Sequence, residues 1–138
     1  GKFLFASIRI PLENMRKYLA QHYESSNPVL GAFDDKEELL GWIDINRSNI
    51  EELAHIGTIA MGVRKSSRGQ GIGGALLDAC IHQARELGLE KLELEVFGSN
   101  SAARALYKKK GFFEEGIRLK KRKFEGHYDD LVCMGMFL

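Results

Sequence analysis

A glycine-rich loop at residues 64–74 constrains the fold of this chain more than any other segment. It follows an apolar run that ends at Val63, it precedes an amphipathic stretch over residues 74–87, and it holds four of the fifteen glycines. Glycine permits tight turns that expose backbone N–H groups, and a helix N-terminus adds unpaired N–H groups and a positive dipole end. The segment therefore predicts a phosphate-binding loop, which Arg64, Lys65 and Arg68 also favour.

Other interpretations of the loop stay open on these residues. A glycine-rich turn can simply pack closely against its neighbours. A nucleoside-triphosphate loop is disfavoured because no Gly-Lys-Ser/Thr ends the segment. Gly69, Gly71 and Gly74 satisfy the GxGxxG pattern of dinucleotide-binding folds, with Glu93 and Glu95 about twenty residues further on. Against that fold, five residues separate the strand from Gly69, and only a short helix and a hairpin follow the next strand.

Hydrophobic periodicity predicts a mixed sheet with helices on its faces, an α/β (α+β) fold. Residues 3–10 are apolar and prone to form a strand, but the segment is too short to classify. Residues 46–49 read as a polar loop. The predicted strands cover residues 29–33, 39–45, 53–63, 91–97, 112–124 and 128–138, and the predicted helices cover residues 12–23, 74–87 and 101–110.

Single residues set the ends of these elements. Asn100 is the expected N-cap of the helix over residues 101–110, and Gly111 is expected just past its end. Gly88 is expected in a left-handed conformation at the end of the longest helix. Gly57 and Gly62 interrupt the strand over residues 53–63 and indicate a bulge or a close backbone approach.

Length and charge exclude several classes of protein. A chain of 138 residues predicts one domain over residues 1–138. Lys and Arg total 20 against 19 Asp and Glu, which argues against a dedicated nucleic-acid binder. No apolar run approaches the ~18 residues of a membrane span. Cys80 and Cys133 fit neither a metal-ligand nor a disulfide pattern, so we expect no metal site. Together with the absence of a membrane span, this favours a cytoplasmic location and no membrane partner.

Several motifs in one order resemble the GNAT superfamily of acetyl-CoA-dependent N-acetyltransferases. The run Arg68-Gly69-Gln70-Gly71-Ile72-Gly73 matches the Arg/Gln-x-x-Gly-x-Gly/Ala pyrophosphate loop of that superfamily. Asn100 and Tyr107 on a short helix, and then Gly111-Phe112, follow in the order and spacing of the superfamily. The resemblance covers residues 29–138. The N-terminal region is shorter than is usual, so we expect a first strand or helix to be missing or supplied by a partner.

The resemblance implies a sheet that splays between the strand ending at Val63 and the strand ending near Phe97, with acetyl-CoA in the split. Asn100 would bond the cofactor near its thioester end. A homodimer is compatible with the resemblance. The backbone of Met61, Gly62 and Val63 would pair with the pantetheine arm, and the backbone N–H groups of Arg68, Gly69, Gln70, Gly71, Ile72, Gly73 and Gly74 would hold the pyrophosphate.

Tyr107 is the candidate general acid. Residues seven apart on a helix differ by about 20° around the axis and about 10.5 Å along it, so Asn100 and Tyr107 share a face. A phenol with an unperturbed pKa of about 10 is protonated at pH 7 and can protonate the departing CoA thiolate. The alternative is an ordinary core tyrosine.

The general base is less determined. Many members of the superfamily carry an acid late in the strand before the loop, where this chain has Thr58, with His55 further back. Glu95 is the better candidate, because it lies on the polar face of its strand and matches a base glutamate of the ribosomal-protein alanine acetyltransferases in the same superfamily. The alternatives are that Glu93 and Glu95 only face solvent, or that water accepts the proton.

Two runs of basic residues can each be interpreted either as a ligand contact or as a purely structural feature. Lys108, Lys109 and Lys110 either contact the 3′-phosphate of CoA or form a solvated helix end, and we favour the helix end. The basic residues among residues 118–123 either attract an acidic substrate or protect a strand edge from pairing, and we favour edge protection.

The sequence thus predicts an N-acetyltransferase that moves acetyl from acetyl-CoA to a primary amine of a small molecule or peptide. Direct attack within a ternary complex is expected, because no nucleophilic serine or cysteine motif is present. The alternative from another class is an acyl-CoA-binding sensor without catalysis. The sequence does not determine the acceptor amine.

Overall fold

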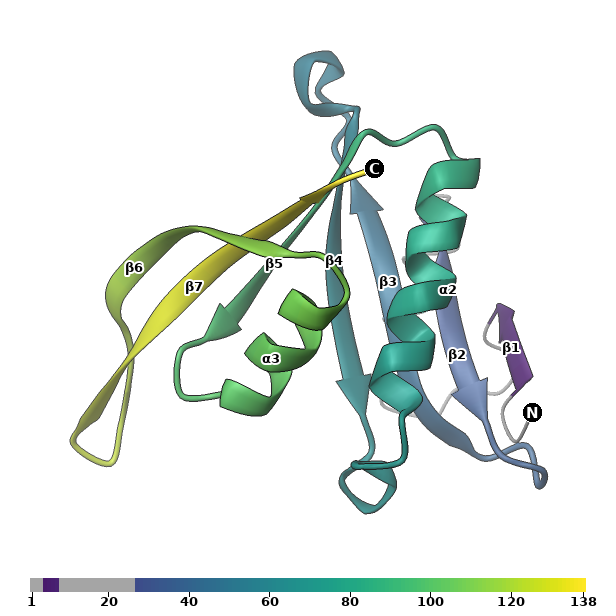
Figure 1. The fold of residues 1–138 in the computed structure, drawn as a ribbon, viewed down its shortest axis with the longest axis horizontal. Coiled ribbons are helices and arrows are strands. Elements are labelled where there is room, and N and C mark those ends of the chain that lie inside the picture. Colours follow the sequence, from purple (N-terminus) through teal and green to yellow (C-terminus); the bar gives the residue numbers. More distant parts are fainter. Residues whose placement is uncertain (1–3, 8–26) are drawn as a thin grey trace.

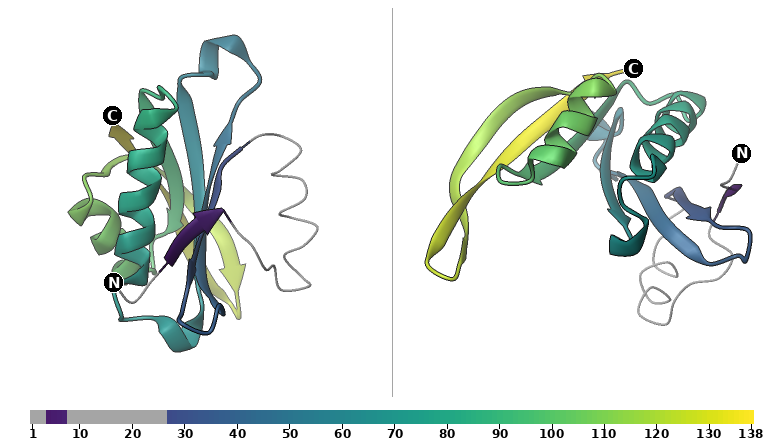
Figure 2. Two further views of the ribbon diagram at one scale, coloured as in Figure 1. Left: turned by 90° about the vertical axis from the view of Figure 1, so that its right-hand side faces the viewer. Right: turned by 60° about the horizontal axis from the view of Figure 1, so that its bottom comes forward.

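The computed structural model describes residues 4–7 and 27–138, and the predicted helix over residues 12–23 lies outside them. Within these residues, seven strands form one sheet in the order β1-β2-β3-β4-β5-β7-β6, and two helices lie on one face of it (Figures 1 and 2). The strands are β1 (Leu4–Ser7), β2 (Val29–Phe33), β3 (Leu39–Arg47), β4 (Ile56–Val63), β5 (Lys91–Phe97), β6 (Phe113–Phe124) and β7 (His127–Phe137). The helices are α2 (Ile72–Glu86) and α3 (Ser101–Lys109), with short 3-10 turns η1 (Glu51–Leu53) and η2 (Lys65–Ser67).

The predicted mixed α/β (α+β) sheet is confirmed, with three differences at element ends. β3 runs to Arg47, beyond the predicted loop start, because its last two residues pair with Thr58 and Gly57. β4 begins at Ile56 rather than at residue 53, because residues 51–53 form the turn η1. The other predicted boundaries lie within about two residues of the observed ones, the usual spread between assignments of helix and strand ends.

The third difference concerns the start of α2, which begins at Ile72 rather than at Gly74. Gly71 is the N-cap, with a φ of 81°, and its carbonyl oxygen accepts the first helical hydrogen bond from the N–H of Ala75 at 3.1 Å. A left-handed residue at this point can only be glycine without strain, so Gly71 rather than Gly74 fixes where the helix begins.

The core lies between the sheet and the two helices. The apolar stripe predicted for α2 packs against isoleucines of β3 and β4, and Leu76, Leu77 and Cys80 are fully buried there. Gly57 is the predicted close approach: a Cβ atom on it would lie 2.7 Å from Ile45 Cγ2. Burial of each large side chain contributes about 1.5–3 kcal/mol, so this layer fixes α2 and, with it, the glycine-rich loop.

The sheet splits between β4 and β5. These strands form a parallel ladder over three residue pairs only, which ends where Thr58 pairs with Glu93. Beyond that pair β4 continues to Val63 and β5 to Phe97, and Figure 1 shows the two strands diverging. The remaining neighbours in the sheet are antiparallel. The splay that the family resemblance implied is therefore present.

The last two strands form a hairpin at the edge of the sheet. β6 is the edge strand and is exposed along its whole length, and the hairpin projects from the body of the molecule (Figure 1). Glu125 and Gly126 turn the chain with φ angles of 49° and 77°, the left-handed pair that a two-residue hairpin turn requires. The basic residues of β6 thus lie on the edge strand of the sheet, where either edge protection, which we favour, or contact with an acidic substrate stays a prediction.

Candidate active site

The glycine-rich loop presents backbone N–H groups at the wide end of the split. Gly69 and Gly71 have φ angles of 79° and 81°, and a Cβ atom on either would meet nothing within 4 Å. Because the first helical hydrogen bond starts at Ala75, the N–H groups of Ile72, Gly73 and Gly74 have no partner within the helix. The loop therefore has the geometry of an anion site at a helix N-terminus.

The basic side chains around this loop are partly engaged with the protein. Arg68 Nε donates to the carbonyl oxygen of Val63 at 3.4 Å, and Arg64 lies 3.6 Å from the carboxylate of Glu38. The side chain of Ile72 is buried in the core, whereas Gln70 is exposed. The backbone N–H groups are therefore the groups that all residues of this loop can offer a ligand.

The backbone of Met61 faces the split. The N–H of Ala60 donates to Asp44 Oδ1 on β3 at 3.2 Å, and the N–H of Arg64 donates to the carbonyl oxygen of Leu40 at 2.8 Å. Since successive residues of a strand direct their backbone groups to opposite edges, Met61 and Val63 direct theirs away from β3. The backbone groups of Gly62, which the sequence also assigned to the pantetheine arm, are directed to β3 instead. No strand pairs with β4 there among the described residues, so these groups are available to an extended ligand.

Asn100 and Tyr107 lie at opposite ends of α3. Asn100 is the N-cap, as predicted, and its Oδ1 accepts from the N–H of Ala103 at 3.2 Å. Tyr107 is buried, with its ring 6.0 Å from that of Phe112 in an edge-on arrangement. The described residues give its hydroxyl no hydrogen bond, and burial raises the pKa of this phenol above its usual value. The ring of Tyr107 therefore packs as part of the core, while its hydroxyl stays protonated at neutral pH and can donate a hydrogen bond.

Glu95 differs from its neighbour Glu93 in its contacts. Lys91 Nζ lies 3.8 Å from Glu93 and 2.9 Å from Glu115, so Glu93 is part of an ion-pair network. Glu95 is exposed, opposite Cys133 in the ladder with β7, and makes no ion pair or hydrogen bond within the part of the chain described. Of the two carboxylates, Glu95 is the one available to a ligand.

Tyr107 and Glu95 lie on opposite faces of the split sheet. Tyr107 belongs to the core cluster that also holds Leu94 and Val96 of β5. Glu95 lies between these two residues in sequence, and side chains alternate along a strand, so it points to the other face. Thr58 is exposed on that face as well, while His55 precedes β4 at the paired end of the split. One gap is thereby flanked by a buried phenol and an exposed carboxylate.

Two residues near the split were given no role by the sequence. Trp42 and Asp44 pair with Gly62 and Ala60 of β4. These two residues alternate with the core residues of β4, as Thr58 does, so Trp42 and Asp44 lie on the same face of the sheet as Glu95. Asp44 is fully buried, and desolvation raises its pKa to about 6 although it accepts hydrogen bonds from Ala60 and Asn46. Polar residues alternating with isoleucines along this strand were the signal that could have indicated this second face.

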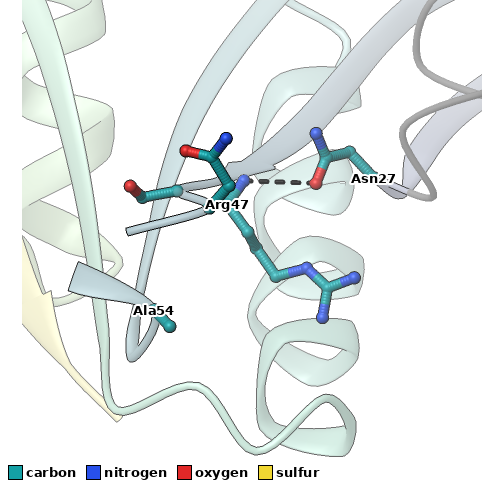
Figure 3. A pocket seen from close by; sticks show the side chains of 5 residues that line it. Asn27, Arg47 and Ala54 are labelled. Carbon is teal, nitrogen blue, oxygen red and sulfur yellow. Dashed lines mark hydrogen bonds between the residues drawn. The ribbon is translucent and has the colours of Figure 1, made fainter. Parts of the chain in front are cut away.

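Two hollows differ in their distance from the split. One of about 470 Å³ lies beside the β3–β4 loop, where the N–H of Arg47 donates to Asn27 Oδ1 at 3.2 Å (Figure 3). Arg47 on its rim pairs with Gly57, which lies seven residues, or about 23 Å of extended strand, before the glycine-rich loop begins at Arg64. The other, of about 320 Å³, includes Gly62, Val63 and Arg64 and adjoins that loop.

The lysines that close α3 are partly ion-paired. Lys108 lies 3.3 Å from Glu114, and Lys110 lies 2.9 Å from Asp78 on α2. Lys109 is exposed. Two of the three lysines thus hold α3 to its neighbours, in keeping with a structural helix end.

The described residues also bear on metal, membrane and thiol chemistry. They contain no group of three or more His, Cys, Asp or Glu side chains arranged as metal ligands, and no helix among them is long and apolar enough to cross a bilayer. Both cysteines are free. Burial, and to a lesser extent the charge of Asp44, raises the pKa of Cys80 to about 12, so this thiol is not a nucleophile at neutral pH.

Comparison with known proteins gives one consistent result. The family model for the acetyltransferase (GNAT) family matches residues 5–112. A Bacillus subtilis protein named uncharacterized N-acetyltransferase YdgE is 32% identical over 64% of this chain and 57% of its own length. The matched segment therefore spans a little more than half of that relative.

Solved structures agree with this match. The ribosomal-protein-alanine N-acetyltransferase from Brucella melitensis superposes with a TM-score of 0.82 at 28% identity, over 94% of this chain and 80% of that one. The fold is also that of a phosphinothricin acetyltransferase from Sinorhizobium meliloti solved in complex with AcCoA. For that structure the TM-score is 0.83 at 22% identity, over 93% of this chain and 70% of the other.

Proposed function

The chain belongs to the acetyltransferase (GNAT) family, and we propose that it transfers the acetyl group of acetyl-CoA to a primary amine of a small molecule or peptide. One observation carries the proposal. The ladder between β4 and β5 ends at Thr58 and Glu93, and the gap beyond it has Tyr107 on one face and Glu95 on the other.

The chain's own groups fit the parts of acetyl-CoA. The diphosphate would be held by the N–H groups of the loop from Arg68 to Gly74, where two left-handed glycines and a helix N-terminus favour an anion. The amides of the pantetheine arm would pair with Met61 and Val63, whose backbone groups face the gap. Asn100 would bond near the thioester, through the side-chain nitrogen that its N-cap bond leaves available.

The reaction that these groups support is a direct displacement. The amine nitrogen attacks the thioester carbonyl carbon, the carbon–sulfur bond breaks, and the electron pair leaves on sulfur. Tyr107 donates its proton to that sulfur, and Glu95 accepts the proton lost by the amine, directly or through one water. The N–H of Met61 donates to the carbonyl oxygen as charge develops on it, so catalysis is largely positioning and polarisation.

The competing functions make different demands on the fold. A dinucleotide-binding fold needs several parallel strands, whereas β4–β5 is the parallel pair among the described strands. An acyl-CoA sensor would need the protein groups that bind the cofactor, but it would need neither Tyr107 nor Glu95. We propose further that the protein works in the cytoplasm, alone or as a homodimer. Because its net charge is only +1, we also propose that it does not bind nucleic acid.

The test is a screen for acceptor-dependent release of CoA from acetyl-CoA over polyamines, amino acids, aminoglycosides and peptide N-termini. Relatives are named for acceptors as different as a ribosomal-protein alanine and phosphinothricin, so the screen must be broad. We expect Tyr107→Phe to lower kcat by about 10²-fold or more while the Kd for CoA stays unchanged. Tight CoA binding with no turnover on any acceptor would instead support the sensor.

A further inference from the structure

The placement of α3 depends on more than apolar packing. The helix has nine residues, and Tyr107 is the one residue of it that is buried. Isolated helices shorter than about 12–15 residues are marginal in water, so contacts from other elements must hold this one. Because α3 carries both Asn100 at its cap and Tyr107, those contacts also position the candidate site.

The turn that connects β5 to α3 is held by the hairpin. The N–H of Ser99 donates to Asp129 Oδ1 at 3.1 Å, and the hydroxyl of the same serine donates to Asp129 Oδ2. Beside it, the N–H of Gly98 donates to the carbonyl oxygen of Asp130 at 2.8 Å. Asp129 thus joins two segments that are 30 residues apart in the sequence.

The carboxylate of Asp129 is itself held in place. Arg122 Nη2 lies 2.9 Å from its Oδ2, and the Asp129 side chain is only 15% exposed. The guanidinium carbon of Arg122 lies 3.9 Å from the ring centroid of Phe97, the last residue of β5. The hydrogen bonds from Ser99, and then Arg122, keep the pKa of Asp129 below its usual value, so it stays ionised at neutral pH.

A bulge in β6 directs Arg122 to this position. The ladder with β7 shifts between Arg118 and Arg122, where β6 holds two more residues than its partner. Lys120, in the bulge, has a φ of 51°, and its N–H donates to Asp130 Oδ1 at 2.9 Å. A left-handed lysine is strained, and its persistence here indicates that the surrounding contacts enforce the bulge.

From these contacts we propose that Asp129 is a positioning residue for acetyl transfer. It holds the turn at Ser99 in place, and this turn sets the position of the N-cap and the direction of the axis of α3. Asn100 and Tyr107 are thereby placed correctly relative to the gap between β4 and β5. The inference rests on the proposed function. Displacement of a reacting group by about 1 Å can cost about 10²-fold in rate, so loss of this hold would lower turnover without removing the cofactor site.

Removal of Asp129 should not unfold α3, because a second anchor remains. Arg104 donates to the carbonyl oxygen of Gly98 at 3.1 Å and lies 2.6 Å from Glu114, so it ties the middle of α3 to β6. The expected defect is therefore loss of precise placement rather than loss of the helix.

The experiment compares Asp129→Asn with Glu125→Gln, a matched loss of charge at the exposed tip of the same hairpin. We expect Asp129→Asn to lower kcat by about tenfold or more, with the Kd for CoA and the Tm close to those of Glu125→Gln. In a Tyr107→Phe background the same substitution should add less than about threefold, because residues that act as a unit are not additive. Full kcat in Asp129→Asn, or an equal loss in both backgrounds, would overturn the inference.

Amide hydrogen exchange separates this inference from the proposed function. In the protein without ligand, residues 99–107 should exchange faster in Asp129→Asn than in Glu125→Gln, whatever the activity of Tyr107→Phe. Equal exchange in the two variants contradicts the hold on α3. Undiminished turnover in Tyr107→Phe contradicts the role of Tyr107 and leaves the exchange result to decide on Asp129.

Discussion

The indole of Trp42 covers the backbone of Gly62 across the β3–β4 ladder. The two residues are register partners, and a Cβ atom on Gly62 would lie 2.9 Å from Trp42 Nε1. Gly62 follows Met61, whose N–H faces the split, so the single tryptophan of the chain lies beside the proposed path of the pantetheine arm. A side chain at this position would have to displace the ring.

Trp42 should therefore report cofactor binding. We expect saturating CoA to change Trp42 fluorescence, and Gly62→Ala to shift the emission of the free protein and raise the Kd for CoA. Gly116→Ala is the control, because a Cβ atom there would meet nothing within 4 Å. Calorimetric CoA binding with no change in Trp42 emission would place the ligand elsewhere.

Two left-handed glycines allow strain to be separated from binding. Gly71 and Gly88 have φ angles of 81° and 76°, and a Cβ atom on either would meet nothing within 4 Å. Alanine at each should cost about 1–2 kcal/mol of stability, measured by urea unfolding. Only Gly71→Ala should also weaken CoA binding, because Gly88 lies at the far end of α2. Equal CoA affinity in the two variants would contradict the loop as the diphosphate site.

Asp44 should make stability depend on pH. Burial raises its pKa from 3.8 to about 6, so between these values the native protein binds more protons than the unfolded chain. The free energy of unfolding should therefore fall as pH rises from 4 to 6, by about 3 kcal/mol at most. Asp44→Asn should flatten this slope, whereas Asp35→Asn, in the exposed β2–β3 turn, should keep it. An unchanged slope in Asp44→Asn would contradict the shift.

Tyr107 should set no limit on activity at moderately alkaline pH. Because burial raises its pKa above the usual 10.0, the phenol titrates only above pH 10 and is mostly protonated below it. The wild type should show no decline of kcat centred below that pH, and any decline centred above it should be absent from Tyr107→Phe. A loss of kcat centred near pH 8 or 9 that Tyr107→Phe abolishes would show a lowered pKa and contradict the effect of burial.

The local features of this protein follow from its sequence alone. The glycine-rich loop, the Asn100 cap, the left-handed Gly88 and the last hairpin follow from backbone and capping rules that act over a few residues. The family followed from motifs in order, and the face of Glu95 followed from alternation along one strand. The strand and helix starts were less well determined, since Gly71 rather than Gly74 begins α2.

Long-range packing, by contrast, determines which of these features meet. It decided where the β4–β5 ladder ends, that Trp42 covers Gly62, that Asp44 is buried, and that Asp129 holds Ser99. Each of these relationships joins residues far apart in the sequence. Their geometry depends on strand register and on packing summed over the whole core, so no local pattern of residues can specify it.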